Sequence, residues 1–127
     1  GFVKAPGEAP GPTIQIPARP ARVDVKQGRE FFVLACAPCH GESGRGDGPN
    51  VSSPEFPKDL AGRPLRPRDL TKGQFKLSTD PEQIYLRIAA GVPPAMPAFR
   101  ETFQPDQLWS VVEYLRQDLM PATIARK

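Results

Sequence analysis

The sequence predicts an all-α protein made of short helices and long, proline-rich loops. It has 17 prolines among 127 residues. Because proline lacks a backbone N–H, it interrupts both helices and central strands. Apolar residues recur at helical spacing in three segments, 25–35, 79–90 and 105–119. Hydrophobic residues make up 39% of the chain, which suits one lean core. Such a core indicates that something besides side chains fills the interior.

The chain before the first helix is a proline- and glycine-rich extension without helical or strand spacing. It is expected to be either a linker or an arm lying across the domain, since apolar residues between 14 and 23 offer contacts. Helical spacing begins in the segment 25–35, where Gly28 permits close approach by another element. We therefore divide the chain into an extension at 1–24 and a domain at 25–127.

Two further helices are expected beyond a turn-rich stretch at 41–75. Thr79 can cap the first of them, and Glu82 completes a capping box. Gly91 is expected to end that helix, and the last helix starts near Pro105. The apolar stripe of the last helix comprises Leu108, Val111, Val112, Leu115 and Leu119.

Both cysteines and the single histidine lie within five residues, at 36–40 (CAPCH). Cys-x-x-Cys-His is the attachment pattern of c-type haem. Two thiols three positions apart at a helix end can reach the two vinyl groups on one porphyrin edge. His40 then lies beneath the iron and can ligate it. The sequence thus predicts one haem c, attached through Cys36 and Cys39.

Three other uses of the cysteine pair fit the sequence less well. A zinc site needs about four ligands, usually in two separated pairs, and this chain has no second pair. A thioredoxin-like dithiol needs a strand–helix context, which the proline-rich helical pattern lacks. A disulfide across so short a separation would stabilise little through loop closure.

The second axial ligand is expected to be Met96. His40 is the only histidine, so a second histidine ligand from this chain is excluded. Met96 lies between Pro94 and Pro97, and a stiff segment can hold a thioether against iron with little loss of entropy. Met120 ends the last helix, where packing is expected. A His/Met pair raises the reduction potential and fills the coordination sphere, which favours outer-sphere electron transfer over catalysis.

In this order and spacing, the motifs resemble those of class I monohaem c-type cytochromes of bacterial type. The resemblance covers about residues 25–120, from the helix before CAPCH through the MPAF segment at 96–99 to the final helix. It implies the cytochrome c fold, with the first and last helices packed crosswise around one haem. It also implies that Phe31 or Phe32 meets the last helix, at Trp109, Val112 or Leu115.

The resemblance implies two further contacts in the haem site. The carbonyl of Pro49 is expected to accept a hydrogen bond from the ring N–H of His40, which would orient the imidazole. Arg68 is expected to pair with a haem propionate. The long N-terminal arm and the loop at 50–75 depart from the minimal family pattern, and we expect this loop to cover a haem edge or the propionates.

The charge distribution favours a protein partner over nucleic acid. The net charge is only +3, and no basic cluster with stacking aromatics is present. Residues 58–76 hold six cations against two carboxylates, a local charge of +4. They are expected to form either a docking face for an acidic redox partner or a solvated loop. The chain has no apolar run long enough for a transmembrane segment, which leaves open a lipid or helical anchor that the chain has lost.

The sequence therefore predicts a monomeric electron-transfer protein rather than an enzyme. We expect an exported bacterial protein, in the periplasm or at the outer face of the cytoplasmic membrane. Its respiratory partners would be a quinol-oxidising complex or a dehydrogenase on one side and a terminal oxidase or reductase on the other. One alternative is a cytochrome subunit or excised domain of a larger redox enzyme. The other is a haem sensor or peroxidase-like protein, which needs an open sixth position.

Overall fold

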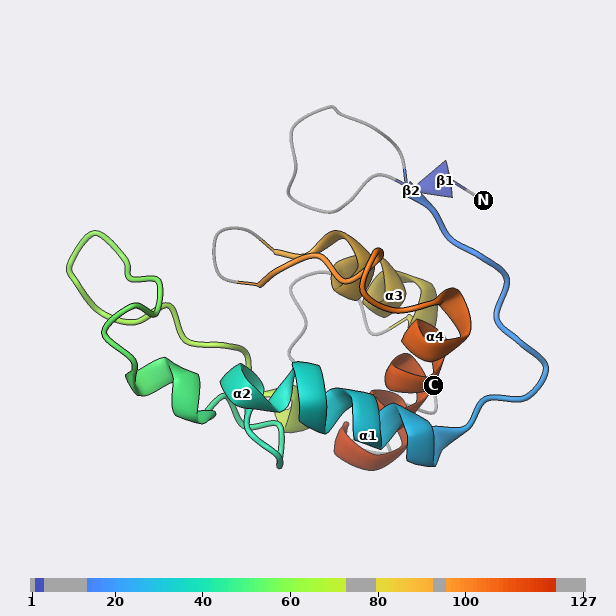
Figure 1. Cartoon of the computed structure of the whole chain (residues 1–127), viewed down its shortest axis with the longest axis horizontal. Helices are drawn as coiled ribbons and strands as arrows, with labels where there is room; N and C mark the ends of the chain where they lie inside the picture. The colour runs from blue at the N-terminus through green and yellow to red at the C-terminus, as the bar shows by residue number, and fades with distance from the viewer. Residues whose placement is uncertain (1, 4–13, 73–79, 93–95, 121–127) are drawn as a thin grey trace.

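The computed structural model describes residues 2–3, 14–72, 80–92 and 96–120 (Figure 1). The α-helices are α1 (Val25–Ala35), α2 (Ala37–His40), α3 (Pro81–Ala90) and α4 (Pro105–Tyr114). Two short 3-10 helices, η1 (Pro49–Ser52) and η2 (Leu70–Lys72), lie in the loops, and the π-helical turn η3 (Leu115–Leu119) continues α4. The strands β1 (Phe2–Val3) and β2 (Ile14–Gln15) form an antiparallel pair in the extension. Helices build the described part of the domain, so the predicted all-α class is confirmed.

Helix α1 has the bounds that the sequence predicts, and it packs across α4 (Figure 1). Asp24 caps its first turn, because the side chain accepts a hydrogen bond from the backbone N–H of Gln27 at 3.2 Å. Gly28 is buried against α4, where a Cβ atom would come within 1.9 Å of the carbonyl oxygen of Ser110. Phe32 meets α4 at this crossing, but its ring contact is with Tyr114, at 5.4 Å between centroids, rather than with the expected Trp109.

Helices α3 and α4 also lie close to their predicted positions. Helix α3 starts at Pro81 with Asp80 in the N-cap position, and the expected cap Thr79 lies outside the described residues. Gly91 ends α3 with a φ of 77°, a backbone conformation that glycine adopts without strain. Helix α4 begins with a reciprocal capping box between Gln104 and Gln107.

The described part of the extension lies across the domain. Ile16 is buried in the core, and the carbonyl of Pro17 accepts a hydrogen bond from the indole N–H of Trp109 at 3.1 Å. Arg19 forms an ion pair at 3.0 Å with Glu113, whose side chain is only 3% exposed. Residues 14–24 therefore agree with the interpretation of the extension as an arm lying across the domain, not as a linker. The domain boundary after residue 24 stays a prediction.

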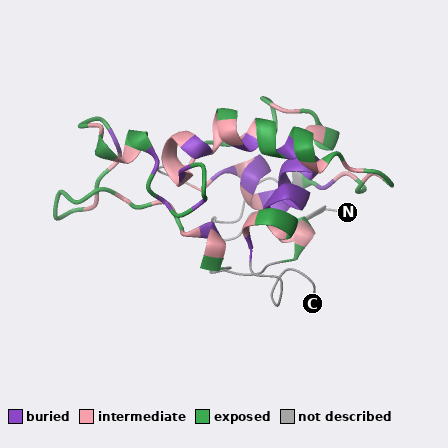
Figure 2. Cartoon of the chain, turned by 90° about the horizontal axis from the view of Figure 1, so that it is seen from below, coloured by how far each residue is buried: buried purple, intermediate pink, exposed green. Residues whose placement is uncertain are grey.

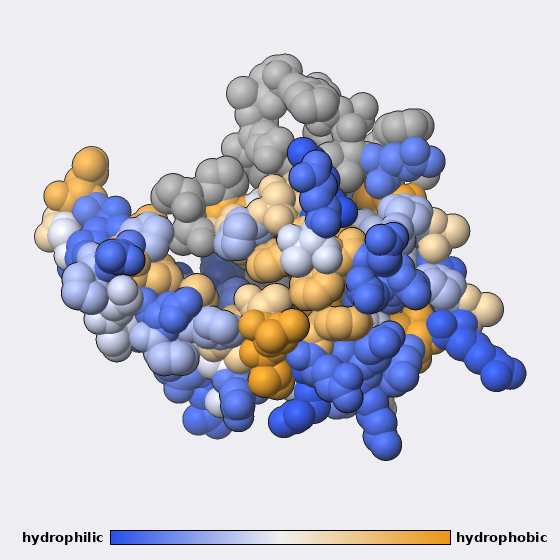
Figure 3. Space-filling view, in the orientation of Figure 1, coloured by the Kyte–Doolittle hydropathy of each residue, from blue (hydrophilic) through white to orange (hydrophobic). Residues whose placement is uncertain are grey.

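The buried residues concentrate where α1, α3 and α4 meet, and the loop around residues 57–64 projects away from them (Figure 2). Trp109, Phe32 and Leu86 are among the most deeply buried side chains. Hydrophilic residues cover most of the face seen in Figure 3, and Leu60, in the projecting loop, is fully exposed. Within the described ranges, no helix has the length and apolar character needed to cross a membrane.

Candidate functional site

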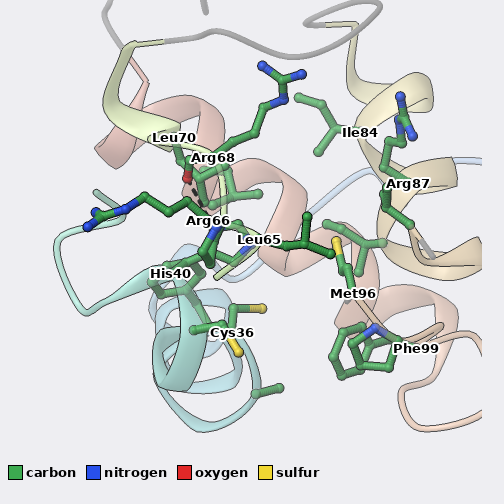
Figure 4. Close-up of a pocket in the computed structure, with 18 of the residues that line it drawn as sticks. Cys36, His40, Leu65, Arg66, Arg68, Leu70, Ile84, Arg87, Met96 and Phe99 are labelled. Carbon is green, nitrogen blue, oxygen red and sulfur yellow. Dashed lines mark hydrogen bonds between the residues drawn. The ribbon is translucent and has the colours of Figure 1, made fainter. Parts of the chain in front are cut away.

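A cavity of about 360 Å³ opens between α1, α2, the loop at 65–70, α3 and the segment that carries Met96 (Figure 4). Its size lies within the range of cofactor and ligand sites. Apolar side chains dominate the lining, and Phe32, Ile84 and Leu115 belong to the buried core as well. The composition indicates an interior that side chains alone do not fill, and this cavity is such a space.

The CAPCH segment forms one wall of this cavity. Cys36 ends α1 and also precedes α2, and its carbonyl accepts hydrogen bonds from the N–H groups of Cys39 at 3.2 Å and His40 at 2.8 Å. This single turn brings all three side chains to the cavity lining. The structure therefore places together the three residues from which the sequence predicts haem attachment.

The cysteines lie in an apolar environment unlike that of a reactive dithiol. Burial raises the pKa of the Cys36 thiol to about 12, and the charge of Cys39 acts in the same direction. Reactive thiol pairs have lowered pKa values, because a nearby positive charge or helix end stabilises the thiolate. In the described ranges, no group of three or more His, Cys, Asp or Glu side chains is placed to hold a metal ion. Both observations weigh against the dithiol and zinc alternatives.

The imidazole of His40 is held by a carbonyl, but not by the one that the sequence analysis expects. The Nδ1 atom of His40 lies 3.2 Å from the carbonyl oxygen of Arg68. Pro49 is exposed at the start of η1 and is absent from the cavity lining. The loop at 65–70 reaches the imidazole because the N–H of Leu70 donates to the carbonyl of Gly44 at 2.7 Å. The expected partner Pro49 is thus replaced by Arg68.

This contact prepares His40 to act as a metal ligand. When Nδ1 carries the proton and donates to the Arg68 carbonyl, the lone pair of Nε2 is free to bind a metal. Burial lowers the pKa of His40, while the hydrogen bond to Arg68 opposes that shift. The net effect favours the neutral imidazole, which is the ligating form.

Met96 faces His40 from the other side of the cavity (Figure 4). Met96 and Val92 exchange backbone hydrogen bonds of 2.9 Å each. The N–H of Phe99 donates to the carbonyl of Ile88 at 3.0 Å, which ties this segment to α3. The intervening residues 93–95, including Pro94, lie outside the described residues. Met120, in contrast, is buried in the core and does not line the cavity.

The residues that line the cavity fit a covalently bound haem. The site combines two thiols, an oriented imidazole, a thioether on the opposite wall and an apolar interior. Arg68 contributes its carbonyl to His40, and its side chain lines the cavity, as does that of Arg87. Of these features, the role of the Arg68 carbonyl was missed by sequence reasoning. No local pattern marks it, because 28 residues separate it from His40.

Comparison with known proteins agrees with this fit. Residues 23–115 match the family described as cytochrome C oxidase, cbb3-type, subunit III, and the chain belongs to this family. No curated protein matches the chain. The family and the fold identify a monohaem c-type cytochrome domain with covalently bound haem c.

Two solved structures share the fold. One is a chain of the Kuenenia stuttgartiensis reducing HAO-like protein complex Kustc0457/Kustc0458, with 31% identity and a TM-score of 0.72. The match covers 91% of the present chain and 53% of that chain, so the present chain spans about half of its length. The other is the KustC0563 c-type cytochrome, with 22% identity, a TM-score of 0.51, and coverage of 70% of the present chain and 93% of that chain.

Proposed function

We propose that this domain carries single electrons between redox proteins, with its haem iron held between His40 and Met96. The observation that carries the proposal is the position of these two side chains on opposite walls of one apolar cavity (Figure 4). Haem c supplies the one-electron ferric–ferrous couple. If both His40 and Met96 held the iron, no position would stay open for oxygen or peroxide, which favours electron transfer over sensing or peroxidase chemistry.

The chain's own residues set the conditions for such transfer. The Arg68 carbonyl orients the imidazole of His40 and increases its basicity. The backbone bonds between Met96 and Val92 hold the thioether in place. Because the site is built before any partner arrives, little reorganisation accompanies the change of charge. The apolar lining also excludes water, which raises the reduction potential together with the thioether.

Partners with an acidic docking face are proposed from the cations of the loop at 58–72. Arg63 forms an ion pair within the loop, with its Nε atom 3.4 Å from a carboxylate oxygen of Asp59. The ammonium of Lys58 donates to the carbonyl of Pro54 at 2.6 Å. Both side chains nevertheless keep their charge at the surface, and Arg66 is exposed beside them. Surface charge of this kind accelerates association with an oppositely charged partner and makes it sensitive to salt.

The ligand assignment is tested by Met96→Ala, with Met120→Leu as a matched control. Met96→Ala should abolish the far-red sulfur-to-iron band of the ferric protein, lower the reduction potential and allow carbon monoxide to bind the ferrous form. Met120 lies in the core outside the cavity, so Met120→Leu should leave all three readouts unchanged. An unaltered ferric spectrum and potential in Met96→Ala would refute Met96 as the ligand.

A second candidate function is that of an electron-transfer subunit within a larger redox complex. The family description names an oxidase subunit, and the similar Kuenenia chain belongs to a protein complex and is about twice as long as the match. Purification from native membranes under mild conditions separates the two candidates. Stoichiometric copurification with an oxidase or reductase supports the subunit, and a free haem protein of this mass supports the mobile carrier.

The compartment proposed for the domain is the periplasm or the outer face of the cytoplasmic membrane. It rests on the CAPCH pattern, because thioether attachment of haem takes place on the exported side of bacterial membranes. Fractionation of the source cells, followed by a haem stain of each fraction, tests this assignment. A haem-bearing band confined to the cytoplasm would contradict it.

A further inference from the structure

The loop around residues 57–64 is a hairpin that starts at the edge of the haem cavity and ends in an exposed leucine. Phe56 and Leu65, which flank the hairpin, both line the cavity. The N–H of Leu65 donates to the carbonyl of Pro57 at 2.9 Å and closes the hairpin at this base. Leu60, at the far end, is fully exposed, and Figure 3 shows apolar atoms at the end of the loop with hydrophilic residues next to them.

Hydrogen bonds hold the end of this hairpin in one shape. The N–H of Asp59 donates to the carbonyl of Arg63 at 2.8 Å, and the N–H of Gly62 donates to the carbonyl of Asp59 at 3.0 Å. The side-chain oxygen Oδ1 of Asp59 accepts from the N–H groups of Ala61 at 2.9 Å and Arg63 at 3.0 Å, as in an Asx turn. Leu60 is therefore carried on ordered backbone, so its burial by a partner would cost little conformational entropy.

The surface around Leu60 carries net positive charge. The hairpin and the two residues after it hold three cations, Lys58, Arg63 and Arg66, and one carboxylate, Asp59. All three cations are exposed. The carboxylate is turned into the hairpin, where its Oδ2 atom lies 3.4 Å from the Nε atom of Arg63. An apolar side chain among cations complements an apolar pocket rimmed by carboxylates.

We propose that Leu60 anchors the domain on its redox partner, a protein that receives this side chain in an apolar pocket rimmed by carboxylates. The proposal rests on the electron-transfer function and adds the residue that decides where the partner binds. Because residues at the base of the hairpin line the cavity, a partner seated on Leu60 lies beside the haem. The exposed cations speed the encounter, and burial of the leucine slows dissociation.

A membrane surface matches this hairpin less well than a protein pocket does. A single myristoyl chain binds membranes only marginally, and one leucine side chain is much smaller. A protein pocket encloses the side chain and removes nearly all of its apolar area from water. Isolated exposed leucines are common, but Leu60 differs from the exposed Leu34 of α1 because a hydrogen-bonded hairpin carries it away from the domain (Figure 2).

The test compares Leu60→Ser with the control Leu34→Ser in the haem-loaded protein. The ferrous protein is mixed with washed membranes of the source cells, and its oxidation rate is measured against its concentration at low and high salt. Leu60→Ser should raise KM roughly 10-fold and leave the maximal rate, the reduction potential and the absorption spectrum unchanged. This factor should persist at high salt, because salt screens the cations and not the apolar contact. Leu34→Ser should match the wild type.

Equal KM values for the wild type and Leu60→Ser, or an equal rise in Leu60→Ser and Leu34→Ser, would overturn the proposal. Sedimentation with phosphatidylglycerol vesicles that requires Leu60 would overturn it in favour of a membrane anchor. Dimerisation that requires Leu60 would overturn it in favour of a second copy of the chain. A wild-type protein that the membranes do not oxidise would refute the electron-transfer function itself, which is distinguishable from a failure confined to Leu60→Ser.

Discussion

Gly28 lies at the crossing of α1 and α4, and its replacement by alanine sets two physical effects against each other. Alanine favours the helix by about 1 kcal/mol over glycine. At this position, however, the added Cβ atom would lie 1.9 Å from the carbonyl oxygen of Ser110 and 2.5 Å from its carbonyl carbon. Ordinary van der Waals contact begins near 3.4 Å, so the two helices must separate locally by roughly 1.5 Å.

The clash is expected to outweigh the gain in helix propensity. Overpacking of a core costs about 1–3 kcal/mol, and the upper end applies because the opposing atoms belong to backbone rather than to a flexible side chain. Separation also loosens the packing between Phe32 and Tyr114. After the propensity gain is subtracted, we expect Gly28→Ala to lower the free energy of unfolding by about 2 kcal/mol.

Urea denaturation of the haem-loaded protein, followed by far-ultraviolet circular dichroism, measures this change. Glu30→Ala is the matched control, because Glu30 is exposed on the same helix and should shift stability by less than about 0.5 kcal/mol. If Gly28→Ala were as stable as the wild type or more stable, helix propensity would govern this position, and the argument from close helix approach would be refuted.

Three further changes test other parts of the structure. Gly91→Ala should weaken the far-red band of the ferric protein and lower the free energy of unfolding by about 2 kcal/mol or more. The reason is that φ at Gly91 is 77° and the new Cβ atom would lie 2.7 Å from backbone atoms of the segment that carries Met96. An unchanged spectrum would contradict this prediction. The pKa of Asp69 is lowered chiefly by a hydrogen bond from the hydroxyl of Thr71. The wild type should therefore be more stable than Asp69→Asn above about pH 4, and this advantage should vanish as the pH falls through the folded-state pKa of Asp69. A difference in denaturation midpoints that does not depend on pH would contradict this role of Asp69. Arg19→Ala should lower the free energy of unfolding by about 1 kcal/mol, a value discounted for the partly exposed arginine, because it removes an ion-pair partner of buried Glu113. The control Arg22→Ala, at an exposed position, should leave stability unchanged. Equal denaturation midpoints of the two variants would show that the ion pair contributes nothing.

Much of the fold and site could be predicted because the relevant signals are local. The bounds of α1 follow from apolar spacing that ends at CAPCH, and Gly91 ends α3 as its position predicts. Met96, the expected iron ligand, lines the cavity, and Met120, the expected packing residue, lies in the core. These features depend on periodicity, capping and backbone stiffness over a few residues, and such short-range patterns are visible in the sequence.

The partner of the His40 imidazole could not be predicted in this way. The sequence analysis expects Pro49, nine positions after His40, but the structure provides the carbonyl of Arg68. That choice depends on the path of the loop after η1 and on the bond between Leu70 and Gly44. A carbonyl exists at every residue, so composition cannot single out the one that a folded loop brings to the ring.

The sequence by itself determined the haem attachment pattern, the helical class and the candidate axial pair, because each depends on residue type and short-range spacing. Only the tertiary structure decided which carbonyl orients His40, that residues of the extension dock on α4 through Trp109 and Glu113, and that Arg68 and Arg87 both line the cavity. These contacts join segments far apart in the chain. Their geometry arises from packing the whole domain, and no local preference encodes it.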